Sequence, residues 1–242
     1  MVKENSKEEW LKGLLKKIPM GWQKRRLDQV LSEPSKLSLS EEKKIIKLIE
    51  DVKWAEIYRI ELPTWIYNII GLYYFNKQEY LNAASYFKLA TKTDKEPYLA
   101  YHNYAAALAY LGQQKKDIKT LEESLLTIDK ASKEGKYKKK GHVLYQKAWV
   151  LDTMWRIGKK KKFKEAIEMY NRSIKLNEEE GDRSVADSAR YNSACMFALG
   201  KDYKKAKKFL LGIATEQVIN LAKEDKDLDT MKTLPEYKTI FK

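Results

Sequence analysis

The sequence contains few of the side chains that usually carry out catalysis or hold a metal ion. It has one cysteine, Cys195, and two histidines, His102 and His142. These three residues do not stand at the spacings that are typical of a metal site. The sequence has no phosphate-binding loop, dinucleotide fingerprint or nucleophile elbow. Its carboxylates stand among lysines at helix-face spacing, as surface ion pairs do, and nothing selects a catalytic pair. We therefore expect a protein that is not an enzyme and holds no metal and no cofactor.

Lysine is the abundant charged side chain, and it is unevenly distributed. The net charge is +14. Residues 136–176 hold 13 Lys/Arg against 3 Asp/Glu, whereas the rest of the chain holds 35 against 31. Two basic runs account for most of this excess: Lys138, Lys139 and Lys140, and then Lys159, Lys160, Lys161 and Lys162. A local excess of positive charge favours an acidic partner, and the alternative is a solvated surface that only keeps the protein soluble.

The elements that position these residues are predicted to be helices. Only 5 prolines and 10 glycines interrupt the 242 residues. Apolar residues follow helical spacing over Thr64–Asp94, with a polar break at 76–79. The first face is formed by Tyr67, Ile70, Gly71 and Tyr74, and the second by Tyr80, Ala83, Ala84, Phe87 and Ala90. Small residues such as Gly71 and Ala83 let the two backbones approach closely, so a helix pair is predicted.

This pattern resembles the tetratricopeptide repeat (TPR) signature, whose period is about 34 residues. The matching residues are Tyr67, Gly71, Tyr74, Ala83, Phe87 and Ala90, with further markers at Ala105, Ala148, Ala166, Ala194 and Ala206. The resemblance implies an all-α fold, a right-handed superhelix (solenoid) of antiparallel helix pairs. Its repeats are expected at 64–97, 98–131, 141–177 and 184–214 within a repeat region of 63–214. We expect an N-terminal helical cap at 1–62, including a long helix from about Ser40 to Leu62, and closing helices at 215–242.

Two of the expected repeats depart from the family pattern. In the second repeat, Asp117 stands where a small residue is expected, which leaves the fit between its helices open. In the third repeat, 18 residues separate Ala148 from Ala166, against 12 between Gly71 and Ala83. The first helix or the turn of the third repeat is therefore expected to be longer. In the fourth repeat, Ser184 is a candidate for the N-terminal cap.

The resemblance also implies a site. TPR arrays bind peptides on a concave face lined by the first helix of each pair, often through residues just before the small marker. Side-chain amides suit this role because they both donate to and accept from a peptide backbone. The amides at or next to these positions are Asn68, Asn103, Gln146 and Asn192, and Leu72, Tyr110 and Trp149 would add apolar contact. Asp152 and Cys195 lie further along the same face. The alternative is that the amides are ordinary surface polar residues. A carboxylate clamp of the kind found in some TPR co-chaperones is not expected, because only Asn103 matches it.

The lysines are expected at the turns inside the helix pairs. Lys77, Lys116, Lys159–Lys162 and Lys201 would form a basic ridge along one edge of the array, with Lys138–Lys140 at the opposite edge. We therefore expect a scaffold or adaptor that binds a peptide or helix of an acidic partner. The alternative function is nucleic-acid binding through the lysine-rich third repeat, and self-association stays open. A membrane-surface role for the helix expected at 5–18 is a further alternative to docking on the repeats. Without a secretory signal or an apolar run of about 20 residues, we expect a cytoplasmic protein.

Overall fold

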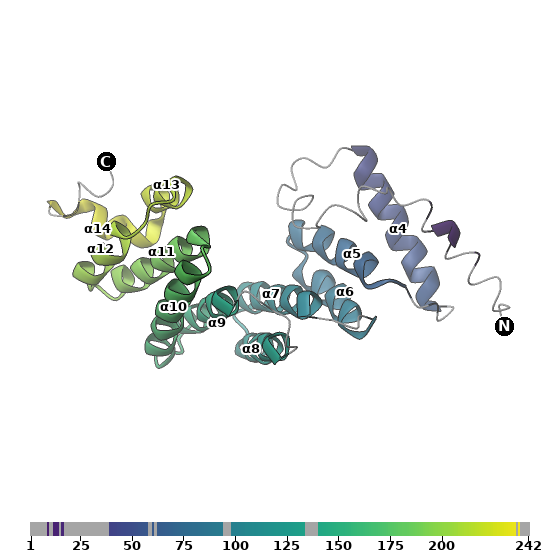
Figure 1. Cartoon of the computed structure of the whole chain (residues 1–242), viewed down its shortest axis with the longest axis horizontal. Helices are drawn as coiled ribbons and strands as arrows, with labels where there is room; N and C mark the ends of the chain where they lie inside the picture. The colour runs from purple at the N-terminus through teal and green to yellow at the C-terminus, as the bar shows by residue number, and fades with distance from the viewer. Residues whose placement is uncertain are drawn as a thin grey trace. The chain divides into compact units, whose positions relative to one another are not determined.

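The computed structural model describes residues 9, 12–14, 16, 39–57, 60, 62–93, 98–133, 140–235 and 237. Among these residues every regular element is a helix, so the all-α class is confirmed (Figure 1). The chain divides into two compact units, Met1–Leu111 (unit 1) and Gly112–Lys242 (unit 2). None of the helices described is long and apolar enough to cross a membrane.

Unit 1 is built from one long helix and a helix pair. It contains α4 (Leu39–Ile57), α5 (Thr64–Asn76), α6 (Tyr80–Thr93) and the part of α7 (Tyr98–Lys115) that ends at Leu111. The long helix ends at Ile57, earlier than the expected Leu62, and Pro63 then precedes the start of α5. Val52 of α4 is buried in one core with Ile66 and Ile70 of α5. Leu14 is buried in the same core, and most of the helix expected at 5–18 lies outside the described residues.

The predicted close approach of α5 and α6 is confirmed. Gly71 faces the ring of Phe87, and a Cβ atom at Gly71 would lie 2.6 Å from that ring. Ala83 and Ala90 of α6 are completely buried. Because the glycine leaves room for the aromatic ring, the small and large residues are complementary and the pair packs tightly.

Unit 2 consists of α8 (Ile118–Lys133), two helix pairs and a C-terminal segment. The pairs are α9 (Lys140–Arg156) with α10 (Lys162–Glu179), and α11 (Arg183–Leu199) with α12 (Tyr203–Leu211). The C-terminal segment contains α13 (Glu216–Glu224), the 3₁₀ turn η2 (Lys226–Leu228) and α14 (Asp229–Thr233). The small markers Ala148, Ala166, Ala194 and Ala206 are fully buried. Each helix packs against its successor in these pairs, as a helical repeat requires.

The extra length of the third expected repeat is shared between helix and turn. Compared with α5 and α6, three of the six additional residues lengthen α9, two lengthen the turn and one lies at the start of α10. In each turn inside a pair, one residue adopts the left-handed conformation. These residues are Gln78, Lys116, Gly158 and Lys201. A left-handed residue reverses the chain directly after a helix end. In the pairs α5–α6, α9–α10 and α11–α12 the second helix then packs against the first.

Helix caps correct one expectation and explain another. Asp182, not Ser184, is the N-cap of α11, because its side chain accepts the Val185 N–H. Asp117 lies just before α8, where its carboxylate accepts hydrogen bonds from the Lys119 N–H and the Thr120 hydroxyl. A capping residue does not have to fit between helices, so the departure from the small residue is accommodated.

Asp187 attaches the C-terminal segment to α11. Its fully buried carboxylate accepts hydrogen bonds from the backbone N–H groups of Ala214 and Thr215, at 3.0 and 2.9 Å, and from the Thr215 hydroxyl at 2.7 Å. Arg190 donates to its other oxygen at 2.8 Å. Burial would raise the pKa of Asp187, but these hydrogen bonds outweigh burial and lower it. The chain is thereby turned so that η2 and α13 lie against α11.

Candidate functional site

In unit 1 the two predicted amides meet each other. Asn103 of α7 donates its side-chain N–H to the Asn68 oxygen of α5 at 3.4 Å. Asn68 is 6% exposed, whereas Asn103 is only partly buried. The two positions are 35 residues apart, one more than the expected period of about 34, so Asn68 stands one residue before the position that matches Asn103. Asn103 is therefore the more accessible of the two amides for a ligand.

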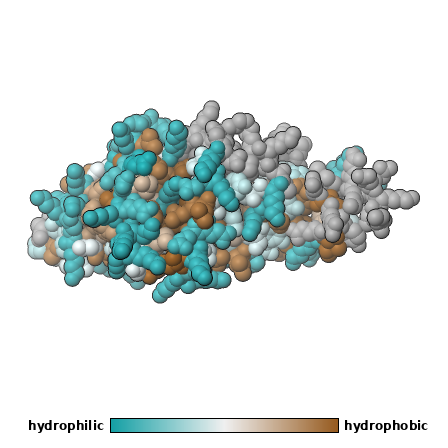
Figure 2. Space-filling view, turned by 90° about the horizontal axis from the view of Figure 1, so that it is seen from below, coloured by the Kyte–Doolittle hydropathy of each residue, from teal (hydrophilic) through white to brown (hydrophobic). Residues whose placement is uncertain are grey.

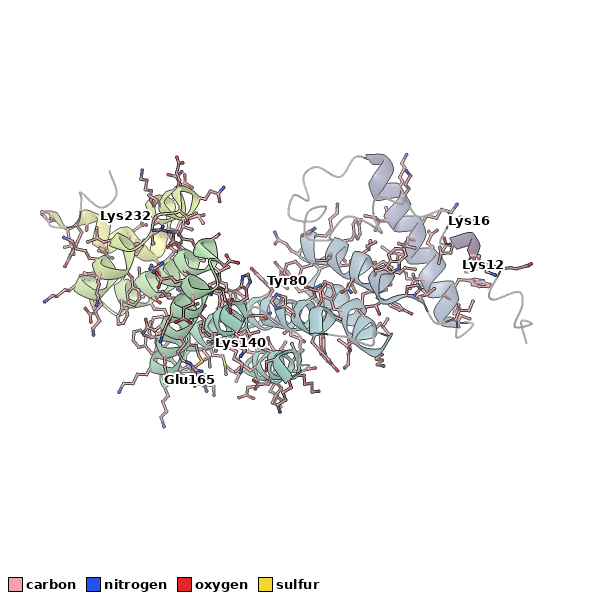
Figure 3. All side chains as sticks on the ribbon, in the orientation of Figure 1. Lys12, Lys16, Tyr80, Lys140, Glu165 and Lys232 are labelled. Atoms are coloured by element: carbon pink, nitrogen blue, oxygen red, sulfur yellow. The ribbon has the colours of Figure 1, made fainter. Side chains whose placement is uncertain are left out.

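The predicted apolar residues of unit 1 belong to aromatic and aliphatic clusters. Leu72 is half-buried and packs against the cluster that contains Phe87 and Tyr104. Tyr110 is 37% exposed, and its ring stacks on Tyr80 and meets the edge of Phe75, each at 5.1 Å between centroids. Figure 3 labels Tyr80 at the start of α6. Tyr110 thus presents a supported aromatic face, which is the kind of surface that binding sites use.

In unit 2 the predicted amides differ in exposure as well. Gln146 of α9 is 8% exposed, and Asn192 of α11 is partly buried. Asn192 donates its side-chain N–H to the Tyr145 hydroxyl of α9 at 3.2 Å. Trp149 of α9 is half-buried. The polar contact again joins two successive first helices, so α9 and α11 share one face.

Further along that face, Arg156 links two carboxylates. Its Nε donates to Asp152 at 2.8 Å, and its Nη1 donates to Asp227 of η2 at 2.6 Å. Asp152 lies four residues before Arg156 on α9 and is 4% exposed. Burial lowers the pKa of Arg156, but the charge and hydrogen bonds of Asp152 and Asp227 outweigh burial and raise it. The guanidinium therefore stays charged and connects α9 to the C-terminal segment.

Asp225 is held from α11 and from its own segment. The Tyr191 hydroxyl donates to its carboxylate, and the Cys195 S–H lies 3.9 Å from the same oxygen. Lys232 of α14, labelled in Figure 3, donates to the Asp225 backbone carbonyl at 2.6 Å. Burial and then hydrogen bonding to Asp225 raise the pKa of Tyr191. Its hydroxyl therefore keeps the proton that it donates.

The Cys195, Asp225 and Asp227 side chains form the group of potential metal ligands identified among the described residues, with ligand atoms within 4.8 Å of one another. Burial, followed by the charges of Asp225 and Asp227, raises the pKa of the Cys195 thiol. A metal ion would need the thiolate, and the Arg156 guanidinium already neutralises Asp227. The chemistry of this group fits internal hydrogen bonding rather than metal binding, and a protonated buried thiol is a poor nucleophile.

Tyr170 of α10 lies beneath this network. Its side chain is completely buried, and its hydroxyl lies beside Asp152 and Asn192 but outside hydrogen-bonding geometry. Burial, followed by the charge of Asp152, raises the pKa of Tyr170. The polar groups of α9, α10 and α11 thus converge in a nearly dry environment, where charge interactions are stronger than in water.

The predicted basic run of the third repeat is at one end of unit 2. Lys159, Lys160 and Lys161 are exposed in the turn between α9 and α10. Lys162 is half-buried and pairs with Glu165 at 2.7 Å, and Glu165 is labelled in Figure 3. The face of unit 2 seen in Figure 2 shows long hydrophilic side chains among small apolar areas.

A second basic turn lies next to the first. The Phe163 ring contacts Trp155 at 5.2 Å and Phe197 at 5.5 Å, which joins the turn after α9 to the turn after α11. Lys160 lies over Trp155 and Lys205 over Phe197, at 5.4 and 5.2 Å from the ring centroids. Residues 157–165 and 200–208 each contain five lysines and one acidic residue. We call these two segments the basic end of unit 2.

The other predicted basic run is only partly described. Lys138 and Lys139 lie outside the described residues. Lys140 is exposed at the first residue of α9, and Lys159 follows the other end of this helix. Because 17 helical residues rise by roughly 25 Å, Lys140 lies far from the basic end, as expected for opposite edges.

Several residues of the α9–α11 face were missed by sequence reasoning. Asp152 and Cys195 were placed on this face, but Arg156, Tyr191, Asp225 and Asp227 were not assigned to it. One signal was present, because Arg156 follows Asp152 by four residues, the spacing of a helical ion pair. The acidic pair at 225 and 227 gave no comparable signal, since its position depends on the loop that Asp187 fixes.

Comparison with known proteins gives no family for this chain. No protein-family model matches the sequence, and the curated proteins include no detectable relative.

The burial of the Asp152 carboxylate predicts how the stability of the folded chain depends on pH. Burial raises its pKa to about 6 from an ordinary 3.8, although Arg156 opposes this shift. The folded state therefore binds the proton more tightly than the unfolded state. Relative to the Asp152→Asn variant, the wild-type chain should lose about 2 kcal/mol of stability as the pH rises from 4 to 6. Urea unfolding of both chains at several pH values measures this difference. A difference that does not change with pH would contradict the prediction.

Proposed function

We propose that this protein is a non-catalytic cytoplasmic scaffold or adaptor of the TPR type. Its helix pairs would stack in a right-handed superhelix, and their first-helix faces would bind a peptide or helix of an acidic partner. The motif resemblance over 64–214 and the succession of adjacent helix pairs support this proposal. The fold alone does not specify a function, so the side chains on these faces must supply the specificity.

The observation that carries the proposal is the alignment of polar groups on successive first helices. Asn103 meets Asn68 between α7 and α5, and Asn192 meets Tyr145 between α11 and α9. An asparagine amide offers two N–H donors and a carbonyl oxygen with two lone pairs. The contact with Asn68 uses one donor of Asn103, and the contact with Tyr145 uses one donor of Asn192. A peptide backbone can bind the second N–H donor and the carbonyl oxygen of each of these amides.

The expected partner is acidic because the basic end of unit 2 follows α9 and α11, whereas Asp152, Asp225 and Asp227 at this face already have partners within the chain. The basic end carries ten lysines against two acidic residues. Arg156 already binds a carboxylate in the structure of the free chain. Positive charge around a binding face accelerates the encounter with an acidic partner and disfavours basic competitors.

Nucleic-acid binding through the basic end is the second candidate function. It is favoured by the placement of Lys160 over Trp155 and of Lys205 over Phe197, which combines cations with aromatic rings. Phosphate backbones attract such lysines, and bases stack on aromatic rings. Against this candidate, Phe197 is buried and Trp155 is half-buried, which leaves little ring surface for stacking. Self-association through the same surfaces is a further form of the protein-binding proposal.

The amide contacts give the first test of this function. Replacing both Asn103 and Asn192 by Ala should weaken partner capture from an extract of the native source at least tenfold, because two backbone contacts are lost. Stability should fall by no more than about 1 kcal/mol for each substitution, since each removes one partly buried hydrogen bond. Quantitative mass spectrometry of the captured proteins, with and without nuclease, measures the effect.

The matched control for this test is the double variant Asn82→Ala/Asn171→Ala. These two exposed asparagines lie on the second helices α6 and α10. Equal capture by wild type, control and the Asn103/Asn192 variant would reject the proposed amide contacts.

The basic end gives the second test. Reversal of Lys159, Lys160, Lys161 and Lys162 to Glu should slow association with the captured partner at least tenfold and change dissociation less, because long-range attraction acts mainly on encounter. Stopped-flow or surface-based kinetics at two salt concentrations measures both rates.

The charge-matched control reverses four exposed lysines elsewhere in unit 2, namely Lys119, Lys130, Lys133 and Lys223. If both variants associate with the partner as fast as the wild type does at low salt, Lys159–Lys162 only solvate the surface. Loss of capture after nuclease treatment would instead favour the nucleic-acid candidate.

A further inference from the structure

The C-terminal segment lies against α11 and reaches the last residue of α9 with a defined pattern of side chains. Asp225 accepts a hydrogen bond from Tyr191 of α11, and Asp227 binds Arg156 of α9. Leu228 and Met231 are fully buried in a core cluster with Ala194, Cys195 and Ala198 of α11. The segment therefore presents two carboxylates two residues apart, followed by apolar residues one and four positions after the second carboxylate.

The residues that receive this segment are held in place by other parts of unit 2. Arg156 is fixed at its Nε by the buried Asp152, so that its Nη1 points to the carboxylate of Asp227. Because Asp152 already holds one edge of the planar guanidinium, the arginine side chain loses little conformational entropy when a ligand binds the other edge. The site thus offers the guanidinium of Arg156 on α9, the hydroxyl of Tyr191 on α11 and an apolar surface around Ala194 on α11.

The turn of the segment is stabilised by its own contacts. The Asp227 N–H donates to the Asp225 carboxylate at 2.7 Å, and Lys232 donates to the Asp225 carbonyl. These contacts are local in sequence, so a separate peptide of the same pattern can form them. In the chain itself the loop after α12, which Asp187 holds, adds a tether to these contacts.

We propose that this face of α9 and α11 is a binding site for an acidic protein segment, and that residues 225–231 fill it as an internal competitor. The partner segment carries two carboxylates two residues apart and apolar residues at the next and fourth positions after them. This inference rests on the proposed function, because it specifies the acidic partner and the residues that receive it. A tethered ligand acts at a high effective concentration, so the partner binds when the internal segment is displaced.

The test uses a fluorescent peptide with the sequence of residues 222–235 and full-length protein. Anisotropy measures its affinity for the wild type, for Leu228→Ala, which weakens the apolar anchor, and for Asp225→Asn/Asp227→Asn, which weakens the polar one. We expect the peptide to bind at least ten times more tightly to both variants than to the wild type, because the internal competitor is weaker. The Asn variant keeps both buried apolar residues, so it gives the same comparison if Leu228→Ala loses its cooperative unfolding.

Two further comparisons identify the site. Adding Arg156→Gln to either variant should lower the affinity for the peptide at least tenfold. Adding Arg172→Gln, which replaces an exposed arginine on α10, should leave the affinity unchanged. A scrambled peptide of equal charge should bind at least ten times more weakly than the native order. Equal affinity of the peptide for wild type and both variants overturns the proposal. Insensitivity to Arg156→Gln, or equal binding of the scrambled peptide, also overturns it.

These outcomes are separable from failure of the proposed function. If partner capture is unchanged by the Asn103/Asn192 variant while the peptide binds as expected, the amide contacts are rejected and the acidic-segment site stands. If the peptide fails and the asparagine test succeeds, the protein binds partners by its amides alone.

Discussion

The arrangement of unit 2 depends on one guanidinium that serves two carboxylates. Asp152 is almost fully buried, and an isolated charge there would cost several kcal/mol, so it requires a neighbouring cation. Arg156 supplies this cation from the next helical turn and donates from its Nη1 to Asp227, which belongs to a segment 71 residues later. The same contact that compensates a buried charge inside α9 thus attaches the end of the chain.

The local geometry of the helix pairs could be predicted from the sequence because it depends on residue size. Gly71 against Phe87, and the buried alanines at 148, 166, 194 and 206, sit where close packing requires small residues. The depth of the candidate amides could not be predicted, because it depends on the neighbouring helix. Asn68 and Gln146 are therefore buried, whereas Asn103 and Asn192 are only partly buried. Asp152 and Cys195 share a face by helical periodicity, but Asp225 reaches that face through a loop that Asp187 holds, and periodicity carries no information about such a contact.

The two units present their faces differently. In unit 1 the face around Asn103 and Tyr110 keeps exposed surface, with Tyr110 supported by Tyr80 and Phe75. In unit 2 part of α11 and the last residue of α9 are covered by Asp225, Asp227 and the buried Leu228 and Met231. Each of these two apolar side chains contributes about 1.5–3 kcal/mol to keeping the segment in place, before the loss of chain freedom is subtracted. A partner of unit 2 must therefore match a mixed pattern of charge and apolar contact, which gives selectivity beyond general attraction to lysines.

The most direct test of this account uses the only cysteine as a reporter. Cys195 lies in the core cluster with Leu228 and Met231, next to Asp225. If the segment covers this face, a small thiol reagent should label Cys195 in the folded wild-type chain at least about 100-fold more slowly than in the urea-unfolded chain, as an opening free energy of about 3 kcal/mol requires. Leu228→Ala should accelerate labelling at least tenfold, whereas Leu126→Ala, at an exposed position of α8, should not. Equal labelling of folded and unfolded chains, with helicity retained, would show that the face is open and would contradict the account.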